Sequence, residues 1–227
     1  KLKTKFFKSF MKDNVGVSMG CPWKKRRHMN EGVLDTDKLH RYAEKFHLDT
    51  KNSILKNLNK KSLFFEDFNK VSREMIGKTV FNTTKVHDDV YNVFKEANDV
   101  TLFYKNFSLK KETEQHYTKF LINHIRNPID MSLVKLCKNY EESEYEIIHQ
   151  IPHFIFPIGG LYLTTIPRLI LLLSNHKNKF KILLREIKSI KNPSAKDIYK
   201  LSYLRKCILE MLRLNNPVVT TFRTCLK

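Results

Sequence analysis

The sequence predicts a mainly α-helical fold with little β-structure, and three observations support this prediction. Apolar residues recur at three- and four-residue steps over long stretches, which is the period of a helix with one buried face. Glycine and proline are scarce, with 6 Gly and 7 Pro in 227 residues, whereas an all-β protein needs many turns. A hydrophobic content of 41%, with 16 Phe and 9 Tyr, is enough for a sizeable core.

The formal net charge of +19 suits partners that are themselves anionic: nucleic acid, a membrane surface or an acidic protein. Most of the 42 basic residues are lysines scattered among asparagines, a pattern as typical of a compositional bias as of a binding footprint. Recognition of bases would rely on arginine, which is scarce here. Nucleic-acid binding is therefore the second interpretation of the charge.

The four cysteines, Cys21, Cys137, Cys207 and Cys225, are far apart and form no C-x-x-C pair. This spacing favours neither a disulfide framework nor a zinc site, and we expect a reducing, intracellular compartment. No apolar segment that could act as a signal peptide or anchor stands at the start. Because the chain opens on KLKTKFFKSF and stops just after Arg223, we expect it to be part of a longer protein.

The first predicted helix begins near Pro22, a residue that suits the first turn of a helix. Trp23 and Arg27 are four residues apart and therefore lie on one face of this helix. In isolation, a W-x-x-x-R pattern is typical of a cationic surface helix whose tryptophan packs against the core.

The middle of the chain predicts helices that pack a core. Leu63–Val80 is strongly amphipathic, and residues 87–105 and 110–125 carry apolar side chains among solvent-facing charges. Asn127 and Pro128 mark a break between helices. No internal repeat or low-complexity linker indicates a domain boundary.

The most apolar stretch, residues 151–173, has the length of a transmembrane helix. Its three prolines and Arg168 disfavour a lipid-exposed span, so we expect a long helix buried in a globular core. His149 and His153 are four residues apart, but Pro152 separates them and no acidic ligand stands nearby, which disfavours a metal site.

Near the C-terminus, apolar residues at three- and four-residue steps predict one helix with a buried face; they are Ile198, Leu201, Leu204, Ile208 and Met211. The sequence Asn-Asn-Pro at 215–217 ends this helix, because proline cannot continue the hydrogen-bond ladder. Glu210 and Arg213 are three residues apart on the other side and can pair. Arg223 follows a short β-prone run.

These motifs resemble those of the cytochromes P-450. The string YL…E-x-L-R-L-x-x-P followed by Arg223 is similar to the family's K-helix region, and W-x-x-x-R is similar to its C-helix. The apolar stretch from 151 is similar to the I-helix, and Leu63–Val80 occupies a position similar to that of the E-helix. The order of the motifs is also the order found in the family.

The resemblance implies roles for five of these residues. Trp23, Arg27 and Arg223 hold haem propionates, while Glu210 and Arg213 form a buried pair that fixes the K-helix. The chemistry suits the residue types, because a guanidinium offers a planar fork to a carboxylate and an indole N–H is a hydrogen-bond donor.

In the I-helix region, GGLYLTTIP stands where the family usually has A-G-x-(D/E)-T. Residues 165–167, Thr-Ile-Pro, are similar to the N-T-I-P variant of the cholesterol 7α-hydroxylase and prostacyclin synthase group. The resemblance implies Thr165 as the hydroxyl that faces oxygen, with Thr164 as the second candidate. From the residues alone, both are ordinary helix-interior threonines that bond back to the preceding turn.

The family binds haem iron through a cysteine in an F-x-x-G-x-x-x-C-x-G loop, which none of the four cysteines matches. We therefore expect residues 1–227 to be a single incomplete cytochrome P-450 domain that is inactive alone. The resemblance implies haem as cofactor, a small apolar substrate, and an NADPH-dependent reductase or ferredoxin-type protein as electron donor. It also implies an intracellular parent, whose association with the endoplasmic reticulum would depend on an N-terminal anchor outside this chain.

The alternative is a basic, all-helical binding module for nucleic acid or acidic proteins, without enzymatic activity. Trp23, Arg27 and Arg223 would then be surface residues, and affinity would fall steeply with salt. A third possibility is a cytochrome-derived protein that shares the fold without its chemistry.

Overall fold

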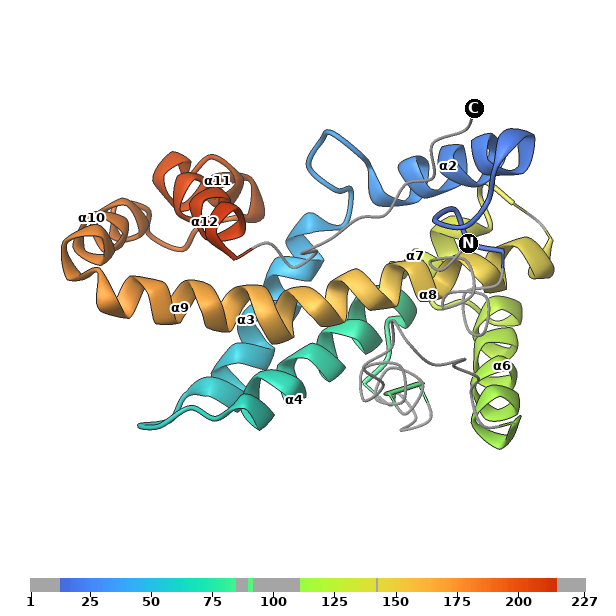
Figure 1. Cartoon of the computed structure of the whole chain (residues 1–227), viewed down its shortest axis with the longest axis horizontal. Helices are drawn as coiled ribbons and strands as arrows, with labels where there is room; N and C mark the ends of the chain where they lie inside the picture. The colour runs from blue at the N-terminus through green and yellow to red at the C-terminus, as the bar shows by residue number, and fades with distance from the viewer. Residues whose placement is uncertain (1–12, 85–89, 92–110, 142, 216–227) are drawn as a thin grey trace, which may run out of the picture. The chain divides into compact units, whose positions relative to one another are not determined.

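The computed structural model describes residues 13–84, 90–91, 111–141 and 143–215, and every regular element in this part of the chain is helical (Figure 1). This confirms the predicted mainly α-helical fold. The elements are α2 (Gly20–Leu34), α3 (Ala43–Leu58), α4 (Phe65–Ile76), the π-helix η1 (Gly77–Phe81), α6 (Lys111–Arg126), α7 (Leu133–Cys137), α8 (Glu144–Gly160), the π-helix η2 (Leu161–Thr165), α9 (Ile166–Asn175), α10 (Lys177–Lys188), α11 (Ala195–Tyr199) and α12 (Ser202–Leu214).

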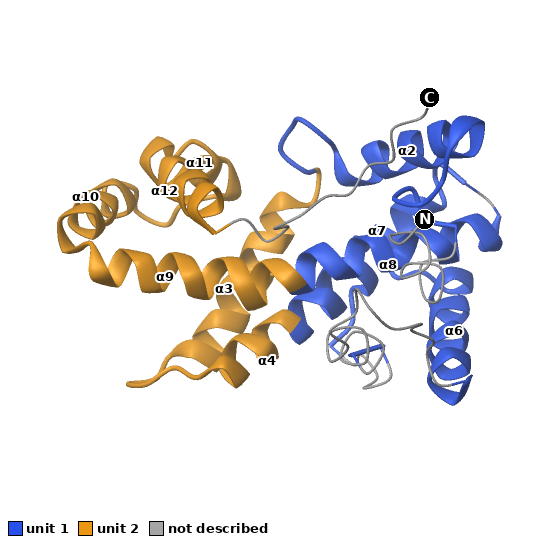
Figure 2. Cartoon of the chain, viewed as in Figure 1, with its two compact units in different colours: residues 1–40, 73–159 blue, residues 41–72, 160–227 orange. Residues whose placement is uncertain are grey.

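The chain divides into two compact units (Figure 2). Unit 1 comprises residues 1–40 and 73–159, and unit 2 comprises residues 41–72 and 160–227. This division does not test whether the two units belong to one incomplete domain, so that remains a prediction.

The core of unit 1 forms around α7, a helix of five residues that contacts α2, α6 and η1. Ser132 caps this helix, because its hydroxyl oxygen accepts a hydrogen bond from the Lys135 backbone N–H at 3.1 Å. Four of the five α7 residues are buried. The buried apolar side chains of the neighbouring elements include Met29, Val33, Phe81, Leu121, Ile125, Ile147, Ile151, Phe154 and Ile155.

Gln150 is a fully buried polar residue in the apolar α8. Its Oε1 accepts hydrogen bonds from the Val15 backbone N–H at 2.9 Å and from Asn30 Nδ2 at 3.2 Å. Its Nε2 donates to the Asp13 carbonyl at 3.0 Å. Because a buried amide without partners is costly, these bonds fix both α2 and the segment before it to α8.

Carboxylates at the start of α8 neutralise basic residues of α2 and α6. The Arg26 guanidinium, with a side chain 11% exposed, pairs with both oxygens of Glu146 at 2.8 and 3.1 Å. The Arg126 guanidinium pairs with Glu144 at 3.0 Å. Acidic groups in a first turn also complement the helix dipole, so this end of α8 is stabilised twice.

Most of the helices predicted in the middle of the chain are confirmed. The predicted helix at 110–125 is α6, which ends at Arg126 just before the predicted break. Leu63–Val80 corresponds to α4 followed by η1. The predicted helix at 87–105 lies almost entirely outside the described residues.

Unit 2 packs α9 against α10 and α12, α10 against α12, and α11 against α3. Side-chain hydrogen bonds connect elements that are far apart in the sequence. Glu44 of α3 accepts a hydrogen bond from the Ala195 backbone N–H at 2.8 Å. The hydroxyls of Thr50 and Tyr162 are hydrogen-bonded at 2.9 Å and fix η2 to α3.

The single helix predicted through residues 198–211 is wrong, because the structure has two helices there. α11 ends at Tyr199, Leu201 has an extended backbone (φ −65°, ψ 97°), and α12 begins at Ser202. Leu201 cannot cap α12 with its own side chain. Instead, the Glu186 carboxylate of α10 accepts hydrogen bonds from the Tyr203 and Leu204 backbone N–H groups at 2.8 and 2.9 Å. This tertiary cap stabilises the interruption.

Elements α8, η2 and α9 form one continuous helical run, Glu144–Asn175, which contains the helix predicted at 151–173. By length and composition alone, this run could cross a membrane. The predicted burial in a globular core holds for α8, which has Ile151 and Phe154 in the core of unit 1. It is wrong for α9, in which no residue is buried.

We expect the Gln150→Leu substitution to lower the free energy of unfolding by about 1–3 kcal/mol, because the Val15 N–H and Asn30 amide lose their buried acceptor. The matched control is Gln115→Leu on the exposed side of α6, which should change the free energy of unfolding by no more than about 0.5 kcal/mol. Urea denaturation followed by circular dichroism measures both. Equal effects of the two substitutions would contradict the role given to Gln150.

Candidate functional site

Trp23 and Arg27 lie on α2, beside the face that packs into unit 1 through Met29, Asn30 and Val33. Trp23 is 40% exposed and the Arg27 side chain 52% exposed. Arg27 Nε donates to Glu31 Oε1 at 2.5 Å. Both side chains are therefore accessible to a carboxylate, although Glu31 already occupies one edge of the guanidinium.

Glu210 and Arg213 pair as the spacing predicts, with two N···O contacts of 2.7 Å. Arg213 lowers the pKa of Glu210 through this hydrogen bond. The expected burial is wrong, because the two side chains are 55% and 67% exposed. α12 places Met211 in the core, which turns Glu210 about 100° away from the buried face and puts Arg213 nearly opposite it. A pair so exposed is screened by solvent and contributes little to stability.

Thr164 and Thr165 lie in η2, a single π-helical turn. Such turns occur often at functional sites. The Thr164 hydroxyl donates to the Gly160 carbonyl at 2.6 Å, the back-bond expected of an ordinary helix-interior threonine. Thr165 is 7% exposed, and its hydroxyl has no hydrogen-bond partner among the described residues. Thr165 is thus the one of the two whose hydroxyl has no described hydrogen-bond partner, in a residue that is itself nearly buried.

Arg223 and Cys225 lie outside the described residues. Of the described cysteines, Cys137 is buried, and burial raises the pKa of its thiol to about 12. Burial also raises the pKa of the Cys207 thiol. Neither favours the thiolate form that a haem iron needs. Within the described ranges, no group of three or more His, Cys, Asp or Glu side chains could hold a metal ion.

The residues present therefore fit haem in part. The indole N–H of Trp23 and the guanidinium of Arg27 are accessible donors that suit a propionate. Neither Cys137 nor Cys207 suits the iron.

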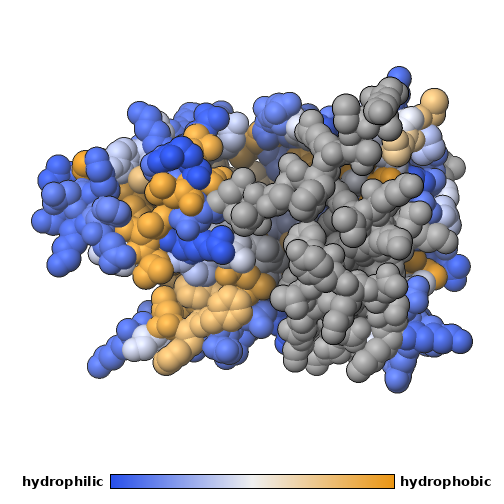
Figure 3. Space-filling model, in the orientation of Figure 1, coloured by the Kyte–Doolittle hydropathy of each residue, from blue (hydrophilic) through white to orange (hydrophobic). Residues whose placement is uncertain are grey.

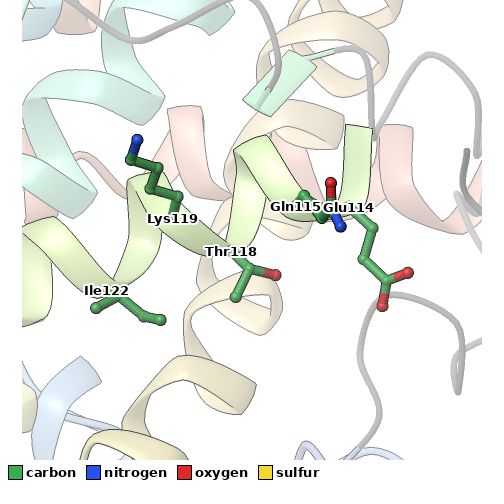
Figure 4. A pocket seen from close by; sticks show the side chains of 5 residues that line it. All are labelled: Glu114, Gln115, Thr118, Lys119 and Ile122. Atoms are coloured by element: carbon green, nitrogen blue, oxygen red, sulfur yellow. The ribbon is translucent and has the colours of Figure 1, made fainter. Parts of the chain in front are cut away.

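A hollow of about 380 Å³ lies against α6 (Figure 4). Its lining residues are Glu114, Gln115, Thr118, Lys119 and Ile122, all from one side of this helix. A binding site needs polar groups that converge from several elements. We therefore assign no function to the hollow, and none of the predicted site residues lines it.

The structure brings the predicted residues together only as local pairs. Trp23 and Arg27 belong to unit 1, whereas the two threonines, Glu210 and Arg213 belong to unit 2. The sequence interpretation missed the Glu186 cap of α12 and the hydrogen bond between Thr50 and Tyr162. The only sequence signal for the cap is that Glu186 is the single acidic residue in the basic stretch KNKFKILLREIK.

No protein-family model matches this sequence, and no curated protein matches it. The fold is similar to that of a solved structure, the retinoic acid-bound cyanobacterial CYP120A1, a cytochrome P-450, with a TM-score of 0.71. The two sequences are 15% identical, and the match covers 91% of this chain and 52% of the other. The chain thus has a cytochrome P-450-like fold and spans about half the length of this structural neighbour.

We expect Glu186→Gln to lower the thermal midpoint of unfolding at pH 7, whereas Glu210→Gln should leave it almost unchanged. Hydrogen bonds, first from Tyr203 N–H, lower the pKa of Glu186. The carboxylate therefore stabilises the fold above its unfolded pKa of about 4.3, and this contribution is lost as the pH falls through the folded pKa. Melting curves from pH 7 down to acid should show the difference between wild type and E186Q disappear; a difference independent of pH would contradict the cap.

We expect Thr164→Val to lower stability and Thr165→Val not to lower it. T164V removes the bond to the Gly160 carbonyl and should lower the free energy of unfolding by about 0.5–1.5 kcal/mol. T165V replaces a hydroxyl that has no described partner in a nearly buried residue and should leave stability unchanged or raise it by up to about 1 kcal/mol. Urea denaturation distinguishes them. A loss of stability in T165V would show that its hydroxyl already has a structural role.

Proposed function

We propose that this chain is part of a haem-thiolate cytochrome P-450 monooxygenase that oxidises a small apolar substrate with O₂. The observation that carries the proposal is the similarity of fold over 91% of the chain to a cytochrome P-450. The W-x-x-x-R, T-T-I-P and E-x-x-R motifs also follow one another in the family's order. A basic binding module accounts for the charge of +19, but not for this similarity.

In this proposal the side chains of α2 bind the cofactor. Trp23 donates its indole N–H and Arg27 its guanidinium to a haem propionate, and Arg223 binds a propionate from its position after α12. The exposure of Trp23 and Arg27 supports this role. Arg27 must share its guanidinium between the propionate and Glu31, or release Glu31. The haem, when bound, supplies the oxygen chemistry.

Thr165 is the residue that we propose to face oxygen. Thr165 is 7% exposed and lies in a π-helical turn, and its hydroxyl, without a described partner, is able to hold a proton at Oγ1. Thr164 is the second candidate, but its hydroxyl is already bonded to Gly160. A closer relation to the cholesterol 7α-hydroxylase and prostacyclin synthase group is supported by residues 165–167 alone and stays a prediction, as does the choice between monooxygenation and peroxide isomerisation.

The electrons would come from an NADPH-dependent reductase or a ferredoxin-type protein that docks on a basic face. We propose that the 227 residues alone do not turn over substrate, because the chain spans about half of its structural neighbour and neither Cys137 nor Cys207 favours a thiolate. An intracellular parent, with membrane association through an N-terminal anchor, stays a prediction.

A haem titration tests the proposed cofactor site. We expect the chain to bind haem about tenfold more tightly than haem dimethyl ester, because only free propionates can accept charged hydrogen bonds from Arg27. Arg27→Gln should abolish this preference. The Soret absorbance measured against ligand concentration gives both affinities.

Lys24→Gln is the matched control, since Lys24 is exposed at one of the variable positions between Trp23 and Arg27 and its substitution also removes one positive charge. It should keep the preference for free haem. Equal affinity for haem and its ester in the unsubstituted chain would overturn the assignment of Trp23 and Arg27 to a propionate.

A further inference from the structure

The first half of α2, residues 20–28, carries Trp23 and Arg27, but none of its residues is buried. The buried residues of this helix all lie in its second half: Met29, Asn30 and Val33. The start of α2 has no side-chain cap, and no acidic residue stands in the first turn. The position of the first half therefore depends on contacts that individual side chains make with other elements. One of these is the pair of Arg26 with Glu146.

The turn that follows α7 makes the other contacts with this half of α2. Its backbone is fixed to α7, because the Tyr140 and Glu141 N–H groups both donate to the Cys137 carbonyl at 3.0 Å. The Glu141 carboxylate pairs with the Lys25 ammonium at 2.5 Å. The Tyr140 ring meets the His28 ring edge to face, with the ring centroids 6.2 Å apart. These contacts connect the first half of α2 to α7, in which four of the five residues are buried.

Gly32 lets the same tyrosine ring lie against the backbone of α2. A Cβ atom at this position would overlap the ring and hydroxyl of Tyr140, so any larger residue has to displace the tyrosine. Glycine inside a helix is less stable than alanine. Helix propensity therefore gives no reason for a glycine here, whereas the close approach of the ring does.

The turn contacts α2 on the side away from the candidate site. Because a helix turns by about 100° per residue, Lys25, His28 and Gly32 form one stripe along α2. Trp23 and Arg27 lie nearly opposite this stripe. The turn can therefore hold the helix without blocking the two side chains.

We call Tyr140 and Glu141 the α2 clamp. We propose that the α2 clamp holds the first half of this helix so that Trp23 and Arg27 meet a ligand carboxylate together. Hydrogen bonds between charged groups weaken as their geometry departs from the ideal, so a helix half that moves would bind the carboxylate less well. The clamp residues are positioning residues and contact no ligand themselves. The identity of the ligand rests on the proposed function, whereas the position of α2 does not.

The chain has a single tryptophan, so the fluorescence of Trp23 reports the order of this helix half without any ligand. We expect Tyr140→Ala to raise the amplitude of the subnanosecond motion of Trp23 about twofold in time-resolved anisotropy, as a flexible site differs from a rigid one. Tyr140→Phe keeps the ring and should leave the amplitude unchanged. The matched control, Tyr199→Ala at an exposed position of unit 2, should also leave it unchanged.

Gly32→Ala is a sharper test, because helix propensity and the α2 clamp predict opposite results. Alanine favours the helix, yet its Cβ displaces the Tyr140 ring, so we expect more motion of Trp23. In the Tyr140→Ala background the ring is absent, and Gly32→Ala should add no motion. Added motion from Gly32→Ala in both backgrounds, or unchanged motion in Tyr140→Ala, would overturn the α2 clamp.

The same variants in the haem titration connect the position of α2 to binding. We expect Tyr140→Ala and Gly32→Ala to reduce the preference for haem over its dimethyl ester by about threefold or more, and Tyr140→Phe to keep it. An unchanged preference in variants whose Trp23 moves more would overturn the role of the clamp in binding. A lack of preference in the unsubstituted chain would instead overturn the propionate assignment, while the anisotropy still decides whether the clamp holds α2.

Discussion

The burial of α8 in unit 1 is the constraint on which the rest of the described structure depends. Its apolar residues enter the core at three- and four-residue steps, and Gln150 is buried among them. Because the Gln150 amide must be satisfied, α2 and the segment before it have one position against α8. Arg26 reinforces this position through Glu146. The outward presentation of Trp23 and Arg27 is therefore a consequence of what α8 buries.

Apolar periodicity predicted most of the helices, because each helix that packs against a neighbour needs a stripe of apolar residues. It failed where the stripe continues across a break. Ile198, Leu201 and Leu204 keep the helical spacing, but the backbone turns at Leu201 and Glu186, far back in the sequence, caps the new helix. The apolar composition of α9 also led us to expect a buried helix, although none of its residues is buried and hydrophobic surface gathers over it in the space-filling view (Figure 3). Composition indicates which side chains favour burial, but not whether a partner covers them.

For the candidate site, the sequence predicted only which residues lie close together on the same helix. Spacings of three and four residues correctly placed Glu210 beside Arg213 and Trp23 beside Arg27. Spacing carries no information on burial, and the expected burial of the first pair was wrong. From the residues alone the two threonines were equivalent, and only the family resemblance ranked Thr165 first; in the structure the Thr164 hydroxyl is bonded to Gly160 and that of Thr165 has no described partner. A polar glutamine within IIHQIPHFIF was the one available signal for the Gln150 network.

The positive charge is not spread evenly over the fold. The composition alone attributes it as readily to a lysine bias as to binding. In unit 1 the carboxylates at the start of α8 neutralise Arg26 and Arg126, and Glu141, just before this helix, pairs with Lys25. In residues 166–215 of unit 2 the three acids accept hydrogen bonds from backbone amides or pair with one arginine, and none of them pairs with a lysine of α10. A bias acting alone would scatter the charge evenly. The imbalance lies in the same part of the chain as α9, the helix in which no residue is buried.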